Sequence, residues 1–150
     1  MKKITLAILA TAAFAATTGA VDMYTPRELK TIEETLAAKH STFASKEFKR
    51  YSNHYTMLAY RAATGSSEVH EHEADIFVIQ DGEGTLITGG ALVNAHTEKP
   101  GELRGSSISG GERAHFAPGD IFHIPAGTPH QMLVEKGKPV AYFVVKVTGQ

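Results

Sequence analysis

The sequence predicts an all-β fold, a sandwich or barrel, with one short helix in front of it. Many short stretches alternate apolar and polar residues, and Gly and Pro clusters separate them at close intervals. The apolar spacing typical of a helix occurs only near the start of the mature chain. The 150 residues, 42% of them hydrophobic, suffice for one domain with its own core.

The first twenty residues have the layout of a secretory signal peptide. Lys2 and Lys3 are followed by an apolar run over 4–16 and by small residues up to Ala20. A buried helix or a membrane anchor is the alternative, but the run is short for a membrane span. We therefore expect a periplasmic or secreted protein that keeps no stable membrane anchor once residues 1–20 are removed.

The composition excludes several classes of function. The formal net charge of -1, with no basic run after the first residues, argues against nucleic acid as a partner. The chain has no cysteine, which excludes disulfides, a lipid-modified mature N-terminus, thiolate catalysis and thiolate metal ligands. Core packing, helped by a bound metal, is then expected to hold the fold together.

Residues 21–53 are predicted to form a helix and a lead-in segment. Thr25 can cap the helix, Pro26 suits its first position, and Glu28 completes a capping box. The helix should extend to about Lys39 and pack against the outside of the main body. Its apolar residues recur on one face: Leu29, Ile32 and Leu36.

Residues 54–150 are predicted to form the β-domain. No repeat or linker interrupts it, and the segment 93–110 is expected to be a surface loop because its pattern is weak. The predicted strands are 54–62, 69–72, 75–80, 85–92, 114–117, 121–124, 131–134 and 140–147.

Two histidines one residue apart stand before an apolar strand. If His70 and His72 belong to one strand, their side chains point to the same face and can bind one metal ion. Asp75 shares the parity of Phe77 and Ile79, so it should point into the core. A buried carboxylate is costly without a partner, and a divalent cation is one such partner.

The second histidine-bearing stretch is GDIFHIPAGTPH, from Gly119 to His130. Pro125 and Gly127 predict a tight corner that directs His130 back across the sheet.

The two stretches together resemble the motifs of the cupin family. The second family motif is glycine, five residues, proline, one residue, glycine, two residues, histidine, three residues, asparagine. Gly119, Pro125, Gly127 and His130 match it, with Val134 in place of the asparagine. The resemblance implies a jelly-roll β-barrel.

The first family motif is glycine, five residues, His-x-His, three or four residues, glutamate, six residues, glycine. His70, His72 and Gly82 match it, but Gly65 lies one residue too close to His70. Asp75 takes the place of the glutamate after only two intervening residues.

The resemblance implies His70, His72 and His130 as ligands of a divalent metal, Fe, Mn or Zn, with Asp75 as the fourth. Glu73 is the alternative carboxylate, although strand parity directs it away from the histidines. A metal-free barrel is the alternative to the whole site.

Several other polar residues are candidates for the surroundings of the metal or for a substrate pocket. His123 lines the cavity or faces outward, according to whether its neighbours pack between the sheets. Glu102 and Arg104 could bind a substrate or a second subunit, or form a solvated salt bridge. The remaining candidates are His115, Tyr60 and Arg61.

Two functions are predicted for such a site. One is a metal-dependent oxygenase or isomerase that acts on a small oxygenated compound. The other is a non-catalytic protein that holds a small ligand or metal. The resemblance also implies a possible homodimer.

Overall fold

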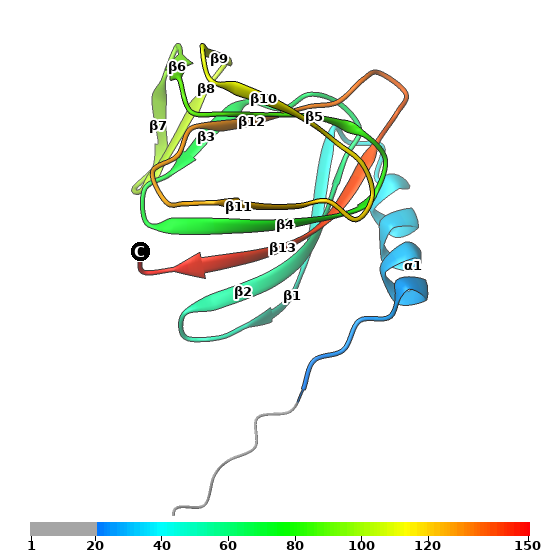
Figure 1. The fold of residues 1–150 in the computed structure, drawn as a ribbon. Helices are drawn as coiled ribbons and strands as arrows, with labels where there is room; N and C mark the ends of the chain where they lie inside the picture. The colour runs from blue at the N-terminus through cyan, green and yellow to red at the C-terminus, as the bar shows by residue number, and fades with distance from the viewer. Residues whose placement is uncertain (1–20) are drawn as a thin grey trace, which may run out of the picture.

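The computed structural model describes residues 21–150, so the predicted signal peptide, residues 1–20, lies outside the described residues. In the described chain, one helix is followed by thirteen β-strands (Figure 1). The all-β prediction with a short N-terminal helix is confirmed. The elements are α1 (Pro26–Ala37), β1 (Phe43–Arg50), β2 (His54–Arg61), β3 (Ser67–His70), β4 (Glu73–Asp81), β5 (Gly84–Thr88), β6 (Ala91–Val93), β7 (His96–Lys99), β8 (Glu102–Gly105), β9 (Ser107–Ser109), β10 (Glu112–Phe116), β11 (Ile121–Ile124), β12 (His130–Leu133) and β13 (Val140–Thr148).

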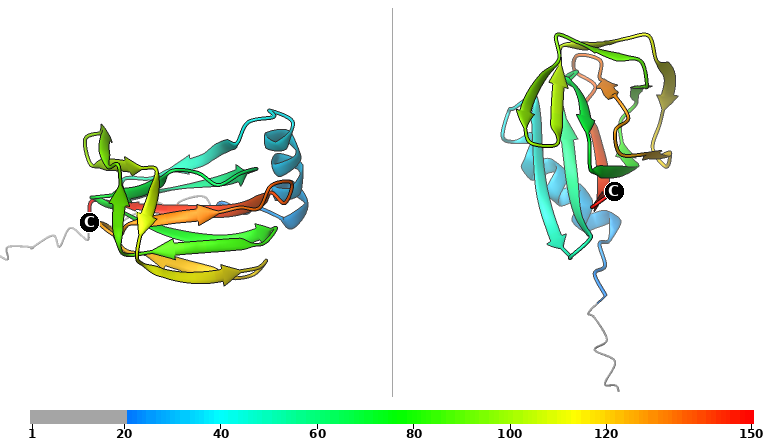
Figure 2. Two further views of the ribbon diagram at one scale, coloured as in Figure 1. Left: turned by 90° about the horizontal axis from the view of Figure 1, so that it is seen from above. Right: turned by 90° about the vertical axis from the view of Figure 1, so that its left-hand side faces the viewer.

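Two antiparallel sheets face each other and form the body of the molecule (Figures 1 and 2). One sheet has the strand order β1-β2-β13-β4-β11, and the other has the order β10-β5-β12-β3-β8-β7. A two-stranded ribbon, β6-β9, stands beside them. Strands adjacent in space are mostly distant in sequence, which is typical of a jelly roll.

The helix α1 lies on the outer face of the five-stranded sheet. Its start is fixed by the predicted capping box: the Thr25 side chain accepts from the Glu28 amide, and the Glu28 carboxylate accepts from the Thr25 amide at 2.8 Å. Leu29 and Leu36 pack there against Leu58 of β2. The predicted position of the helix on the outside of the body is confirmed.

Strand alternation gives the five-stranded sheet two different faces. On β2, Leu58 and Tyr60 pack toward α1, whereas Met57 and Arg61 face the interior between the sheets. The interior is apolar at one end, where the core cluster includes Ile79, Leu86, Phe116 and Val140. Charged side chains gather at the other end.

Two parts of the chain differ from the prediction. The expected loop over 93–110 instead contains β7, β8 and β9; β8 pairs with β3, and β7 forms the edge of that sheet. Phe43–Arg50 forms a further strand, β1, in the lead-in segment. Within residues 21–150, no helix has the length and apolar character that crossing a membrane requires.

Candidate metal centre

A cavity of about 570 Å³ opens between the inner faces of the two sheets. This volume is in the range of small-molecule sites. Polar side chains from β3, β4 and β8 and from β13 line it, together with aromatic and aliphatic side chains of β1, β2 and β13.

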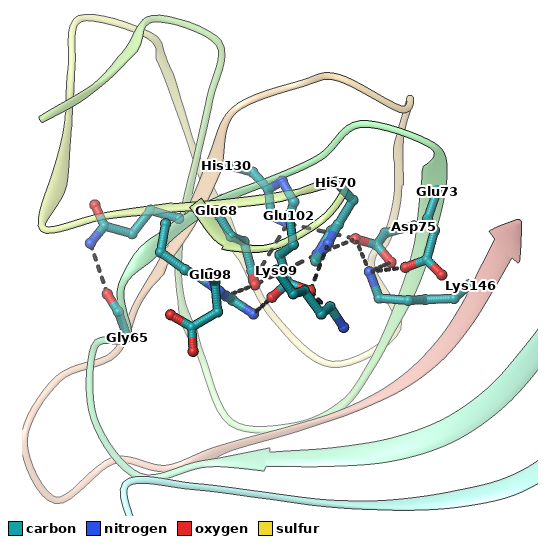
Figure 3. Close-up of polar contacts among 12 residues, drawn as sticks. Gly65, Glu68, His70, Glu73, Asp75, Glu98, Lys99, Glu102, His130 and Lys146 are labelled. Carbon is teal, nitrogen blue, oxygen red and sulfur yellow. Dashed lines mark hydrogen bonds and ion pairs between the residues drawn. The ribbon is translucent and has the colours of Figure 1, made fainter. Parts of the chain in front are cut away.

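Three potential metal ligands meet at the wall of this cavity. Glu68 and His70 lie two residues apart on β3, so they share its inner face. His130 of β12 is the cross-strand partner of Glu68, and such partners project to the same side. Donor atoms of the three side chains lie within 4.8 Å of one another. Figure 3 shows the three side chains directed toward one another.

The corner before β12 positions His130 as predicted. The Thr128 amide donates to the Pro125 carbonyl at 3.2 Å, which closes a turn, and Gly127 takes its positive φ of 75°. The Gly127 amide donates to the His70 carbonyl at 2.8 Å. The turn is therefore tied directly to the end of β3, beside the other histidine.

One hydrogen bond determines which ring nitrogen of His130 is free. Nδ1 lies 3.0 Å from the Thr128 carbonyl oxygen, which can only accept, so Nδ1 must carry a proton. In the neutral ring, Nε2 then presents its lone pair to the cluster. Nε2 is buried and has no hydrogen-bond partner among the described residues, although Oε1 of Glu68 lies 3.5 Å away.

A buried ion pair faces this cluster from the five-stranded sheet. Asp75 of β4 and Lys146 of β13 are cross-strand partners, 1% and 7% exposed, with Nζ 2.8 Å from Oδ1. The inward direction of Asp75 is confirmed. Its Oδ2 lies 3.6 Å from Nε2 of both His70 and His130.

A second group of charges lies on the cavity wall formed by β8. Arg104, the cross-strand partner of Glu68, forms ion pairs with both Glu68 and Glu102. Lys99 adds a further ion pair to Glu102 at 3.0 Å. The predicted salt bridge between Glu102 and Arg104 is present, but Glu102 is buried rather than solvated.

These partners shift the pKa values of the cluster in opposite directions. Burial raises the pKa of Glu68, but the nearby His130 and His70 rings and the Arg104 charge outweigh it and hold the pKa well below its usual value. Burial lowers the pKa of His130, but Glu68, the Thr128 carbonyl and Asp75 raise it overall. The carboxylate is thus ionised at neutral pH.

The structure does not bring His72 into the cluster. Strand β3 ends at His70, and residues 71–72 form a bend, where the Glu71 amide donates to the Gly101 carbonyl at 2.9 Å. The exposed His72 side chain lies over Gly101, where an added Cβ would come within 3.4 Å of its Cδ2. The parity argument needed a continuous strand, and the strand stops two residues too early.

Besides Arg61, one of the other predicted site residues lines the cavity and three lie outside it. Glu73 lines the cavity, and its carboxylate is 3.5 Å from Nζ of Lys146. His115 and His123 are exposed; Phe122 and Ile124 pack into the core, so His123 faces outward. Tyr60 packs in the cluster beneath α1.

Glu68 is the residue that the motif comparison missed. One residue separates Glu68 from His70, four separate His70 from Asp75, and six separate Asp75 from Gly82. These spacings match the first family motif from its first histidine to its second glycine, with Glu68 in place of the first histidine and Asp75 in place of the glutamate, but Ala62 stands where its first glycine belongs. Beyond that glycine, the motif spacing fits better two residues upstream of His70-Glu71-His72.

Comparisons with known proteins agree with this geometry at the level of the fold. No family model matches the chain, and no curated protein matches it. Among solved structures, the cupin domain of Schizosaccharomyces pombe Cnp3 superposes with a TM-score of 0.53 over 72% of this chain and 66% of its own, at 11% identity. The chain has the cupin fold.

Two further structures extend the comparison. A double-stranded β-helix protein of uncharacterised function from Klebsiella pneumoniae gives a TM-score of 0.58 at 14% identity, covering 87% of this chain and 93% of its own. KdgF from Halomonas sp. gives 0.53 at 14% identity, covering 73% and 82%. Because cupin folds host many activities, function has to be argued from the site.

Proposed function

We propose that the barrel binds one divalent metal ion through Glu68, His70 and His130, with Asp75 beside them. The observation that carries this proposal is the buried Nε2 of His130, which in the neutral ring presents a lone pair to Glu68 and His70 and has no hydrogen-bond partner among residues 21–150. Two donors on one ion can be up to about 4 Å apart. The 3.5 Å between Nε2 of His130 and Oε1 of Glu68 is compatible with that limit.

The donor set narrows the choice of metal. Two imidazoles and one carboxylate are a set typical of Fe²⁺ sites, and Mn²⁺ and Zn²⁺ accept the same atoms. When bound, the ion would act as a Lewis acid toward a ligand with adjacent oxygens.

The remaining residues would keep this donor set in place. The Thr128 carbonyl holds the His130 ring in the tautomer that a metal ligand needs. Arg104 orients Glu68 through an ion pair, and Lys146 orients Asp75 in the same way. The cavity beside them has room for a small molecule.

For the activity, we propose a metal-dependent oxygenase or isomerase of a small oxygenated compound. The fold is compatible with catalysis, since a DMSP lyase from Ruegeria pomeroyi superposes on 74% of this chain with a TM-score of 0.51 at 18% identity, the chain spanning 49% of that protein. A non-catalytic binding protein is the second candidate, favoured by the ion-paired state of most charged groups in the cavity. Turnover by the metal-loaded protein separates the two.

Metal content tests the site directly. Wild-type protein, Glu68→Gln, His130→Ala and His72→Ala would be titrated with Fe²⁺, Mn²⁺ and Zn²⁺, and bound metal measured by mass spectrometry. We expect about one equivalent in the wild type and at least about a tenfold loss of affinity in Glu68→Gln and His130→Ala. His72→Ala is the matched control and should bind like the wild type, because its side chain is exposed.

Two results would contradict this ligand set. If His72→Ala loses as much affinity as His130→Ala, His72 is a ligand and the set of Glu68, His70 and His130 is wrong. If none of the three ions binds to the wild type, the barrel is metal-free.

We also propose that the mature protein is periplasmic or secreted and works without nucleic acid. The basic start and apolar run of residues 1–20 support this proposal. N-terminal sequencing of the exported protein should find a start close to Val21. A homodimer is a further proposal, which sedimentation of the mature protein would test.

A further inference from the structure

We propose that Arg61 is a binding site for a carboxylate group of the ligand that enters the cavity. The inference deepens the proposed function by naming the chemical class of the ligand, and it rests on that function only for the other end of the ligand.

Arg61 differs from every other cation that lines the cavity. Lys99, Arg104 and Lys146 each have a carboxylate within 4.0 Å. Arg61 has no such partner among residues 21–150, although it is only 9% exposed. Its Nε is buried and makes no hydrogen bond to the described residues. A buried guanidinium without an anion is costly, so an anion from outside would stabilise it.

The surroundings hold the Arg61 guanidinium at the cavity wall. Its Cζ lies 4.8 Å from the centre of the Phe43 ring, a cation–π contact that leaves the edge of the group free to donate. On another side, Gly65 leaves the room that the guanidinium occupies, since an added Cβ there would lie 1.7 Å from Nη1. The group is thus oriented by packing, although no ion pair holds it.

Tyr142 provides a second polar group on the same face. Burial raises the pKa of its hydroxyl, although the Arg61 charge lowers it in part, so the hydroxyl stays protonated. Tyr142 lines the cavity on β13. A carboxylate bound by Arg61 could therefore accept a further hydrogen bond from Tyr142.

The charge of the cavity favours a carboxylate over a phosphate. Five carboxylates and four cations line it. A doubly charged phosphate would place both charges at Arg61 beside this acidic excess, whereas a carboxylate places one charge there and matches the planar guanidinium; the second carboxylate of an elongated ligand would lie at the proposed metal. The lining carboxylates are Glu68, Glu73, Asp75, Glu98 and Glu102.

The positions of the two ends predict an elongated ligand. Arg61 is the register partner of Val140, and Lys146 lies six residues further along the same strand, beside Asp75. Six residues of strand correspond to about 20 Å between Cα atoms, which the long side chains shorten from both ends. An acid that reaches from Arg61 toward the histidines therefore needs a chain of several atoms.

Titration calorimetry with linear dicarboxylates tests the inference. Succinate, glutarate, adipate and pimelate would be titrated into wild type, Arg61→Met, Gly65→Ala and Arg113→Met, each with and without Zn²⁺, with inorganic phosphate as a second anion. We expect at least one dicarboxylate to bind the wild type and to lose at least about tenfold in affinity in Arg61→Met. Arg113→Met removes the same charge from the surface, where Arg113 is exposed, and should change nothing.

The second variant keeps the charge and moves it. Gly65→Ala should displace the guanidinium and weaken dicarboxylate binding, while Zn²⁺ affinity stays at the wild-type value. If Arg61→Met does not fold, Gly65→Ala and Arg61→Lys decide the question. Each variant's thermal unfolding would be followed alongside.

The inference is overturned if no dicarboxylate binds the wild type at millimolar concentration. It is also overturned if Arg61→Met and Gly65→Ala bind dicarboxylates with wild-type affinity, or if phosphate is the only anion that binds at Arg61. These outcomes are distinct from a failure of the metal site. A protein that binds dicarboxylates through Arg61 but takes up no Zn²⁺ would refute the proposed metal centre alone.

Discussion

At the residue scale, the ion pair between Lys146 and Asp75 joins two neighbouring strands inside the barrel. Both side chains are buried, and each would be an uncompensated charge without the other. Lysine at this position also competes with any metal for the same carboxylate. With the proposed metal bound, Asp75 would have two partners, and the strength of each interaction would depend on whether the other is present.

Replacing Lys146 tests this dependence. Lys146→Met should lower the free energy of unfolding by about 3–5 kcal/mol in the presence of a chelator, because Asp75 is left buried and unpaired. The loss should be smaller with Zn²⁺ bound, since the ion compensates Asp75. Urea unfolding under both conditions measures the difference. The double variant Lys146→Met/Asp75→Leu should lie close to the wild type, and an equal loss with and without Zn²⁺ would exclude Asp75 from the metal site.

The directions of individual side chains explain why the proposed ligand set is only partly predictable from the sequence. Asp75 and His130 could be predicted to point inward, because strand parity and the Pro125–Gly127 corner determine their directions. Parity cannot distinguish Glu68 from His72, since a shift of two residues keeps the same face. The position where β3 ends decides between them, and that depends on the bond from Glu71 to Gly101, which is a tertiary contact.

At the scale of elements, the helix α1 could be predicted from the sequence, whereas the edge strand β7 could not. The helix has strong local signals in Thr25, Pro26 and Glu28, and its predicted start agrees with the structure. The strand β7 has none, because all four of its residues are exposed and no apolar alternation marks it. Its pairing with β8 creates the strand, so the sequence of 93–110 alone predicts a loop.

The role of α1 can be tested through its most buried residue. Leu36 is 2% exposed and packs against β1 and β2, so Leu36→Ala should lower the free energy of unfolding by about 2–5 kcal/mol. Metal affinity should not change, because the helix covers the face of the sheet opposite the cavity. Chemical denaturation and metal titration of this variant measure the two effects. If Leu36→Ala also loses metal affinity, packing of α1 on the outer face of the five-stranded sheet affects the proposed site on its inner face, contrary to this prediction.

At the scale of the whole molecule, the residues of the proposed metal site come from both sheets. Glu68, His70 and His130 belong to β3 and β12, and Asp75 belongs to β4 in the facing sheet. The cluster exists only when the two sheets are closed against each other. Metal binding and folding should therefore be linked.

This linkage predicts a stabilisation by metal. At a free Zn²⁺ concentration about 100 times Kd, the free energy of unfolding should rise by about 2.7 kcal/mol and the melting temperature with it. Scanning calorimetry over a series of Zn²⁺ concentrations measures the effect, and removal by a chelator should reverse it. His130→Ala serves as the control, and an equal rise in that variant would place the bound ion elsewhere.

The hairpin β7-β8 lines the cavity but carries none of the proposed metal ligands. The proposed metal ligands lie on β3 and β12, with Asp75 beside them on β4, whereas Lys99, Glu102 and Arg104 reach the cavity from the sheet edge. Insertions or exchanges in an edge hairpin disturb few other strands. The set of molecules that the cavity admits could therefore diverge among descendants of this chain, while the chemistry at its centre stays the same.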